Sequence, residues 1–171
     1  MSFYSLSLIY SSIKGSPYVA TKNKAIIDMF AKIKFIKGKK FLELGSGDGR
    51  ISRYVAYKYG LYTTGVDVNI LLVWWARFLT FLSFKKDLST SFGMTRVNFG
   101  KENIFKTDFR EFDYLYIFLM PELIEKLELK FKKELKKGAI IISHGFPIER
   151  LKKNLFKKLA RSPFPTYFYR V

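Results

Sequence analysis

The stretch FLELGSGDGR, Phe41–Arg50, decides the fold of this chain. It joins a short apolar run to three glycines at alternate positions, and a segment with helical spacing of apolar residues follows. A strand that passes into a helix through a glycine loop is the opening unit of a βαβ fold, and its loop binds a ligand. The sequence therefore predicts a ligand site on residues 45–49.

The charge of the loop indicates the class of ligand. The dinucleotide fingerprint is G-x-G-x-x-G, whereas Gly45, Gly47 and Gly49 have the spacing G-x-G-x-G, and Glu43 and Asp48 add two carboxylates. Carboxylates would repel a pyrophosphate, which prefers free amides at a helix N-terminus. S-adenosylmethionine carries an ammonium and a sulfonium but no phosphate. We therefore expect S-adenosylmethionine as the cofactor, rather than NAD or ATP.

A second carboxylate position supports this expectation. Asp67, in TTGVDV, follows Gly49 by 18 residues, close to the roughly 20 residues that separate a glycine loop from the ribose-binding acid of a βαβ unit. Asp67 is therefore predicted to bind the ribose hydroxyls. The alternative is that Glu43 and Asp67 only cap the ends of strands.

Apolar periodicity alternates between strand and helix along the whole chain. This pattern predicts an α/β fold, a Rossmann-like three-layer sandwich whose mostly parallel sheet has helices on both faces. A lead-in segment, 1–20, precedes a single domain, 21–171. The predicted strands are 39–44, 62–68, 95–99, 113–119, 138–144 and 166–171, and the predicted helices are 21–36, 50–60, 70–84, 121–135 and 148–160.

The composition restricts the chemistry and the partners. The absence of cysteine excludes disulfides, Cys-based zinc sites and a Cys nucleophile, and no metal site is expected. The net charge of +17 favours an acidic partner, RNA or an anionic membrane face, unless it only reflects a lysine-rich surface. The opening MSFYSLSLIYSS has no basic region or cleavage site typical of a secretory signal. We expect a cytoplasmic monomer that associates with membranes if the apolar helix described below contacts them.

Several segments together resemble one family. They are FLELGSGDGR, GSPYVATKNKAIIDMF (15–30), GVDVNILLVWWARF (65–78), NIFKTDF (103–109), SHGFPI (143–148) and TYFYRV (166–171). Together they resemble the class I, seven-strand methyltransferases that use S-adenosylmethionine. Within that class they are most similar to the small protein-lysine methyltransferases of archaea and to their mitochondrial relatives that act on the ATP synthase c subunit and the adenine nucleotide translocase. The resemblance covers residues 15–171 and implies methyl transfer to lysine in a protein substrate.

The resemblance also implies which residues bind the cofactor. The lead-in Tyr18, Val19 and Thr21 would fold over it, with Ala20 where the family usually has proline. Asn103 stands where the family has an acid for the adenine amine, and its amide oxygen can accept the same hydrogen bond. The remaining implied contacts are Glu43, Leu44, Gly45, Ser46, Gly47, Asp48, Asp67, Val68, Asn69, Glu102, Ile104 and Phe118.

The acceptor side is predicted after the fourth and fifth strands. Candidate catalytic residues are Phe118, Pro121, Glu122 and His144. His144, the single histidine, either positions the substrate or moves a proton, or else has a structural role, and Glu122 either orients an ammonium or is an ordinary first-turn acid. The segment FLMPEL lacks the polar residue and second proline found in enzymes that methylate nucleic-acid amines. A nucleic acid is therefore a less expected partner than a protein.

Two alternatives to lysine methylation stay open at this point. One is methyl transfer to RNA or a small molecule, and the other is a binding module without turnover. The segment 70–84, ILLVWWARFLTFLSF, has one charged residue and is shorter than the about 20 residues that span a bilayer. It is either a buried helix or a membrane-interface helix that uses Trp74, Trp75 and Phe78.

Overall fold

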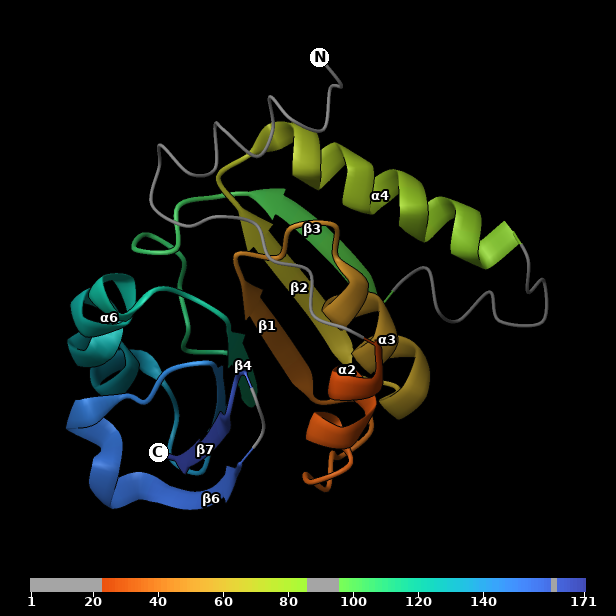
Figure 1. Cartoon of the computed structure of the whole chain (residues 1–171). Coiled ribbons are helices and arrows are strands. Elements are labelled where there is room, and N and C mark those ends of the chain that lie inside the picture. The colour runs from red at the N-terminus through yellow and green to blue at the C-terminus, as the bar shows by residue number, and fades with distance from the viewer. Residues whose placement is uncertain (1–22, 86–95, 161–162) are drawn as a thin grey trace.

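The computed structural model describes residues 23–85, 96–160 and 163–171, and these form one seven-stranded sheet (Figure 1). The strand order is β3-β2-β1-β4-β5-β7-β6. Neighbouring strands from β3 to β5 are parallel, and β7 runs antiparallel between β5 and β6. The bounds are β1 Lys40–Leu44, β2 Tyr62–Asp67, β3 Val97–Lys101, β4 Tyr114–Ile117, β5 Ile140–His144, β6 Leu155–Leu159 and β7 Thr166–Arg170. The predicted α/β, mostly parallel seven-strand fold is confirmed.

The helices cover both faces of this sheet. Figure 1 shows α2 and α3 on one side of it and α6 on the other, while α4 lies along β2 and β3. The bounds are α2 Asn23–Phe30, α3 Arg50–Tyr59, α4 Ile70–Lys85 and α6 Pro121–Glu134, with a 3₁₀ helix, η2, at Glu149–Asn154. The α6 helix begins at a proline, which tolerates the first helical position because it has no N–H to leave unpaired.

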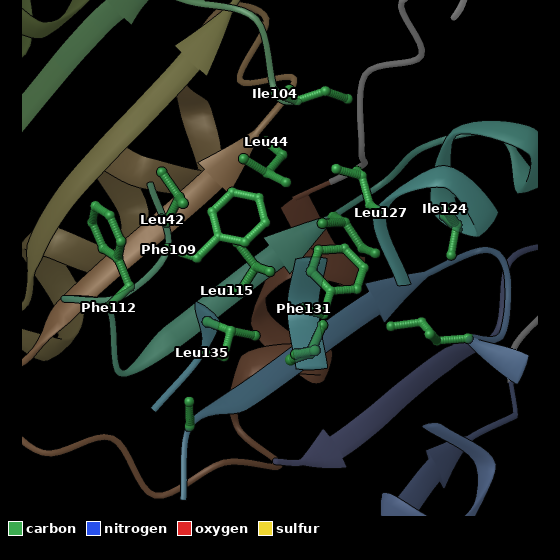
Figure 2. Close-up of a cluster of buried hydrophobic side chains, with 14 of the residues drawn as sticks. Leu42, Leu44, Ile104, Phe109, Phe112, Leu115, Ile124, Leu127, Phe131 and Leu135 are labelled. Carbon is green, nitrogen blue, oxygen red and sulfur yellow. The ribbon is translucent and has the colours of Figure 1, made fainter. Parts of the chain in front are cut away.

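Two hydrophobic clusters hold these layers together. The larger lies between α6 and the sheet, where Leu127 and Phe131 pack with Leu42, Leu44 and Leu115 (Figure 2). The other lies beneath α2 and α3, and it contains Phe30, Phe41, Tyr116, Ile142 and Phe168. Alternate residues of β1 therefore enter opposite clusters, as expected for a strand covered on both faces.

The prediction of a helix over residues 148–160 is wrong. The chain forms only η2 there and then the edge strand β6, which pairs with β7 from Leu155↔Tyr169 to Leu159↔Thr166. Leu151, Leu155 and Leu159 are spaced like one face of a helix, and this spacing led to the error. Pairing with β7 overrides that periodicity because β7 would otherwise present an unpaired row of backbone groups.

The strand order reverses between β1 and β4, whose partners on their other sides are β2 and β5. Ligands of open α/β sheets bind in the crevice at the carboxyl ends of the strands at such a reversal. The loops that follow β1, β2, β4 and β5 are therefore the expected place of the functional site. The lead-in segment 1–20 lies outside the described residues.

Candidate active site at the carboxyl ends of the strands

The glycine loop follows β1 and turns directly into α3. Gly45, Gly47 and Gly49 have φ of 73°, 53° and 72°, in the left-handed region that glycine enters without steric cost. The N–H groups of Gly45 and Ser46 both donate to the Val66 carbonyl, at 2.9 and 3.0 Å. The loop is thereby fastened across the sheet to the end of β2.

Other amides of the loop and of the first turn of α3 donate to side chains of this chain. Three N–H groups point to carboxylates: Gly47 donates to Asp67 Oδ2 (3.0 Å), Arg50 to Asp48 Oδ1 (3.1 Å) and Ser52 to Glu43 Oε2 (3.0 Å). A phosphate-binding loop offers such amides to an anion instead. The loop consequently suits a ligand without phosphate, because these amides are already paired within the chain. S-adenosylmethionine fits this donor set, as the sequence predicts.

Asp67 ends β2 and lies beside the loop. Besides accepting from Gly47, its carboxylate accepts the Asn69 N–H through Oδ1 at 2.8 Å. The Val68 N–H also donates to this carboxylate. Two oxygens have four acceptor positions between them, so three are taken by backbone N–H groups and one remains for a ligand hydroxyl. Burial raises the pKa of Asp67. Asn69 in turn accepts the Leu71 N–H at 3.0 Å and caps the start of α4.

Glu43 is almost fully buried beneath the first turn of α3. Its Oε2 accepts from both the N–H and the hydroxyl of Ser52, at 3.0 and 2.6 Å, and burial raises its pKa to about 8. These contacts agree with the alternative that Glu43 has a structural role at the end of its strand. Contact between Glu43 and the methionine end of the cofactor stays a prediction.

Replacing Glu43 by glutamine is expected to remove a pH dependence of stability. The folded pKa of about 8 lies above the unfolded value of 4.5, so folding binds a proton between these values. The stability linked to this proton is complete below pH 4.5 and is lost as pH rises through 8. Because each pKa unit corresponds to about 1.4 kcal/mol, the wild type should lose a few kcal/mol that Glu43→Gln does not lose. Urea unfolding at pH 5, 7 and 9 measures the difference, with the exposed Glu125→Gln as control. Equal pH slopes in wild type and Glu43→Gln would contradict the expectation.

Asp48 is paired with Arg50 at the start of α3. The guanidinium contacts both carboxylate oxygens, with Nη2–Oδ2 at 2.7 Å. Burial alone would raise the pKa of Asp48, but the hydrogen bonds and charge of Arg50 hold it below its ordinary value. Asp48 is therefore ionised, and Arg53 Nη1 fixes its backbone carbonyl at 2.6 Å. Its predicted contact with the cofactor stays a prediction.

The segment after β3 reaches the same end of the sheet. The Glu102 N–H donates to the Asp67 carbonyl at 2.9 Å, which places this segment beside the predicted ribose position. Asn103 is exposed and its Oδ1 accepts the Phe105 N–H at 3.0 Å, so one acceptor position remains for the adenine amine. Ile104 is buried next to Leu44 (Figure 2).

The other predicted cofactor contacts differ in their burial, and some of them lie outside the described residues. Val68 is half-buried just after β2, and Leu44 lies in the larger hydrophobic cluster. The hydroxyl of Ser46 is buried and has no hydrogen-bond partner among the described residues. Tyr18, Val19 and Thr21 lie outside the described residues.

An aromatic cluster lies at the ends of β4 and β5, where the sequence predicts the acceptor side. Phe118, after β4, meets the ring of His144, at the end of β5, with centroids 4.7 Å apart. Phe164 packs edge-on against Phe118 at 5.2 Å and lies 5.9 Å from His144. His144 is 4% exposed, and its Nδ1 lies 2.9 Å from Thr166 Oγ1. The structure therefore brings together Phe118 and His144, two of the predicted catalytic residues, and it adds Phe164.

Sequence reasoning missed Phe164 because its position depends on pairing between distant strands. The register His144↔Thr166 in the antiparallel β5–β7 pair places the start of β7 beside the end of β5. Phe164 stands two residues before Thr166, in the sequence SPFPTY. An aromatic residue just before the last strand was the available signal.

Pro121 and Glu122 begin α6 beside the glycine loop. A Cβ on Gly45 would lie 3.4 Å from Leu119 Cδ2, which shows that the segment after β4 touches the loop. Glu122 is exposed in the first turn of α6, a favourable position for an acid because of the helix dipole. Roles for Pro121 and Glu122 in catalysis stay predictions.

Known proteins share the sequence that builds this site. Residues 43–154 match the ANTKMT methyltransferase domain model. The chain is 28% identical over 134 residues to the mouse lysine N-methyltransferase named for the c subunit of ATP synthase, and the match covers 78% of this chain and 50% of that protein. It is 31% identical over 139 residues to a protein-lysine N-methyltransferase of Saccharolobus islandicus, with 81% of each chain covered. The chain thus spans about half the length of the vertebrate relatives that it matches.

Solved structures agree on the fold. An RNA methyltransferase from Salinibacter ruber in complex with S-adenosyl-L-homocysteine superposes with a TM-score of 0.76 at 22% identity, covering 90% of this chain and 94% of that one. At this identity the likeness concerns the fold and not the substrate. The domain model matches well over half of the chain, and the chain belongs to the ANTKMT methyltransferase domain family.

Proposed function

We propose that this protein transfers methyl groups from S-adenosylmethionine to lysine side chains of a protein substrate. The observation that carries the proposal is the glycine loop, where amides donate to Val66 and to three carboxylates instead of to a phosphate. Membership of the methyltransferase family supports the reaction class. Two relatives named as lysine N-methyltransferases support the acceptor.

The cofactor would lie along the carboxyl ends of β1, β2 and β3. Asp67 would accept a hydrogen bond from a ribose hydroxyl, Asn103 would accept one from the adenine amine, and the glycine loop would face the methionine end. When bound, S-adenosylmethionine would supply a methyl group on a positively charged sulfur, and the carbon–sulfur bond would break in line with the attacking neutral amine as S-adenosylhomocysteine leaves. The protein's main task is then to hold the amine in that line, which is a proximity effect.

The aromatic cluster would prepare the acceptor lysine. A free lysine has a pKa of about 10.4 and is protonated at neutral pH. Phe118 and Phe164 pack against each other, and desolvation of a lysine that lies against this pair would disfavour its charged ammonium and so lower that pKa. The aromatic faces also attract the methylated ammonium product. The lysine ammonium would release its proton to solvent water before attack, so the neutral amine would be the nucleophile.

His144 is expected to position this cluster rather than to accept the proton. It is buried, contacts the rings of Phe118 and Phe164, and is fixed by Thr166. His144→Ala should therefore lower kcat by about tenfold at every pH from 6 to 9, since misplacement of reacting groups costs rate. His144→Phe, which keeps an aromatic ring, should recover part of that rate. A changed pH profile in His144→Ala would contradict a positioning role and indicate proton transfer.

Incubation of the protein with cell extract and S-adenosylmethionine labelled in its methyl group tests the proposed function. Label should enter protein, and hydrolysis should release labelled methyl-lysine. An Asp67→Ala variant serves as the matched negative control. Methyl transfer to RNA is the second candidate, which the net charge of +17 favours. Label in RNA alone would overturn the lysine proposal, and no label in any fraction would overturn both.

A further inference from the structure

The outward face of α4 is an apolar surface that no described residue covers. The inner side of the helix packs Val73 and Ala76, both fully buried, against Phe99 of β3. The outer side exposes six large side chains, each between 42% and 62% exposed: Leu71, Trp74, Trp75, Phe78, Phe81 and Leu82. Among the described residues, nothing buries this side of α4 as the alternative of a fully buried helix requires.

The exposed side chains, here called the α4 stripe, follow one side of the helix. Leu71, Trp74, Trp75, Phe78 and Leu82 have the spacing i, i+3, i+4, i+7 and i+11, which lines up residues along one helical face. The rings of Trp75 and Phe78 are 5.6 Å apart. Apolar groups in a continuous patch on a protein surface indicate an interaction site.

The helix that carries the α4 stripe has no acidic residue, and two arginines lie next to it. The helix contains no Asp or Glu. Arg77 is exposed on α4 and its guanidinium donates to the Phe99 carbonyl, while Arg53 of α3 donates to the Ala76 carbonyl at 3.4 Å. These two guanidinium groups are held by backbone carbonyls beside the helix. Both carbonyls belong to residues that pack on the inner side of the helix, so the α4 stripe itself is apolar and the residues of α4 add no negative charge to it.

We propose that the α4 stripe lies in the interface of an anionic lipid bilayer. A helix of 16 residues is about 24 Å long, enough for an in-plane anchor. In the part of the chain that the structure describes, no helix has the length and apolarity to cross a membrane. Tryptophan prefers the headgroup region, because its apolar ring can face the acyl chains there while its N–H stays hydrated. Apolar contact and attraction to anionic lipid act together in such helices.

The net charge favours a bilayer over a second copy of this chain. Two molecules that meet through their α4 stripes would each bring a charge of +17, and this repulsion opposes association. The same charge attracts anionic headgroups, because each Lys or Arg near the surface of such a bilayer favours binding. The inference does not depend on the methyl acceptor, because it concerns a face of the protein outside the site at the strand ends.

Intrinsic fluorescence reports directly on this surface. The chain has two tryptophans, and both Trp74 and Trp75 belong to the α4 stripe. Full-length protein is titrated with vesicles of phosphatidylcholine alone or of phosphatidylcholine with phosphatidylglycerol. The anionic vesicles should shift the emission to shorter wavelength, and brominated lipid should quench it. Raising the salt concentration should weaken binding, because it screens the charges.

The variant Phe78→Ser/Leu82→Ser tests the stripe while keeping both reporters. Both side chains are exposed in the free protein, so the fold should persist, and partition into anionic vesicles should fall by about tenfold or more. The control Leu129→Ser/Ile27→Ser removes exposed apolar side chains from α6 and α2, and its partition should be unchanged. Circular dichroism and affinity for S-adenosylmethionine verify the fold of both variants.

Three results would overturn the inference. The first is an emission spectrum that anionic vesicles do not change. The second is an emission that is already blue-shifted and shielded from soluble quencher without lipid, which would indicate that residues 1–22 cover the stripe. The third is a dimer in sedimentation that Phe78→Ser/Leu82→Ser dissociates. The same variant is also assayed for methyl transfer to a soluble lysine peptide. That assay tests the proposed function, whereas vesicle binding tests this inference, so failure of one is distinguished from failure of the other.

Discussion

Replacing Asp67 by alanine is expected to weaken binding of S-adenosylmethionine by about a hundredfold or more. The substitution removes the acceptor for a ribose hydroxyl. It also leaves the Gly47 and Asn69 N–H groups without their carboxylate partner, and each unpaired buried donor costs about 1–3 kcal/mol. Isothermal titration with S-adenosylmethionine and S-adenosylhomocysteine measures the loss.

Two further variants make the result specific. Asp108→Ala removes an exposed carboxylate that is paired with Arg110, and it should leave affinity unchanged. Asp67→Asn keeps the size of the side chain and one acceptor oxygen, so it should bind with intermediate affinity. If Asp67→Ala lowers stability but binds the cofactor as tightly as the wild type, Asp67 only fastens the loop and the ribose role is refuted.

Replacing Gly49 by alanine is expected to lower the free energy of unfolding by roughly 3–5 kcal/mol. Gly49 has φ of +72°, and a Cβ there would lie 2.2 Å from Phe99 Cζ and 3.0 Å from Ala76 Cβ. The backbone strain and the steric clash add together, because Phe99 is fixed in the packing between α4 and the sheet. Urea or thermal unfolding measures the change.

Gly38 provides a matched control for Gly49→Ala. Its φ is +81°, but a Cβ there would meet nothing within 4 Å. Gly38→Ala should therefore cost only the strain, about 1–2 kcal/mol. Phe99→Leu in the Gly49→Ala background should recover part of the clash energy. Equal destabilisation by Gly38→Ala and Gly49→Ala would show that contact with Phe99 contributes nothing.

Local sequence was sufficient to predict the part of the fold that holds the candidate cofactor site. The strand before Gly45, the helix after Gly49 and the strand that ends at Asp67 all occur where the sequence predicts them. In this strand–loop–helix–strand unit, the groups that would contact the ligand and the local backbone conformation both depend on residues close in sequence. The loop needs glycines at its positions of positive φ, and Asp67 needs only to stand at the end of the next strand.

The errors arise where distant segments decide the structure. Residues 148–160 have helical spacing, yet an antiparallel pairing with β7 makes β6 out of 155–159. Periodicity predicts six strands whereas the family resemblance implies seven, and the seventh strand is β6. The outer side of α4 posed a similar problem, because composition alone does not say which apolar residues a sheet will cover.

The candidate site was predicted unevenly for the same reason. Phe118 and His144 follow adjacent buried strands, so their proximity could be foreseen. Phe164 enters the cluster through the β5–β7 register, which no local pattern encodes. The pairing of Glu43 with Ser52 requires the packing of α3 on β1, whereas the sequence showed only an acid before a glycine loop.

The reversal of strand order between β1 and β4 has a consequence for how such a protein diversifies. The part of the chain up to Ile104 carries most of the residues that would bind the cofactor. The part from Phe118 onward carries the aromatic wall that would contact the acceptor. Substitutions between β6 and β7 would alter that wall around Phe164 while Asp67 and its hydrogen bonds stay in place. If the two halves have these roles, the acceptor would change through mutations in the second half of the chain alone.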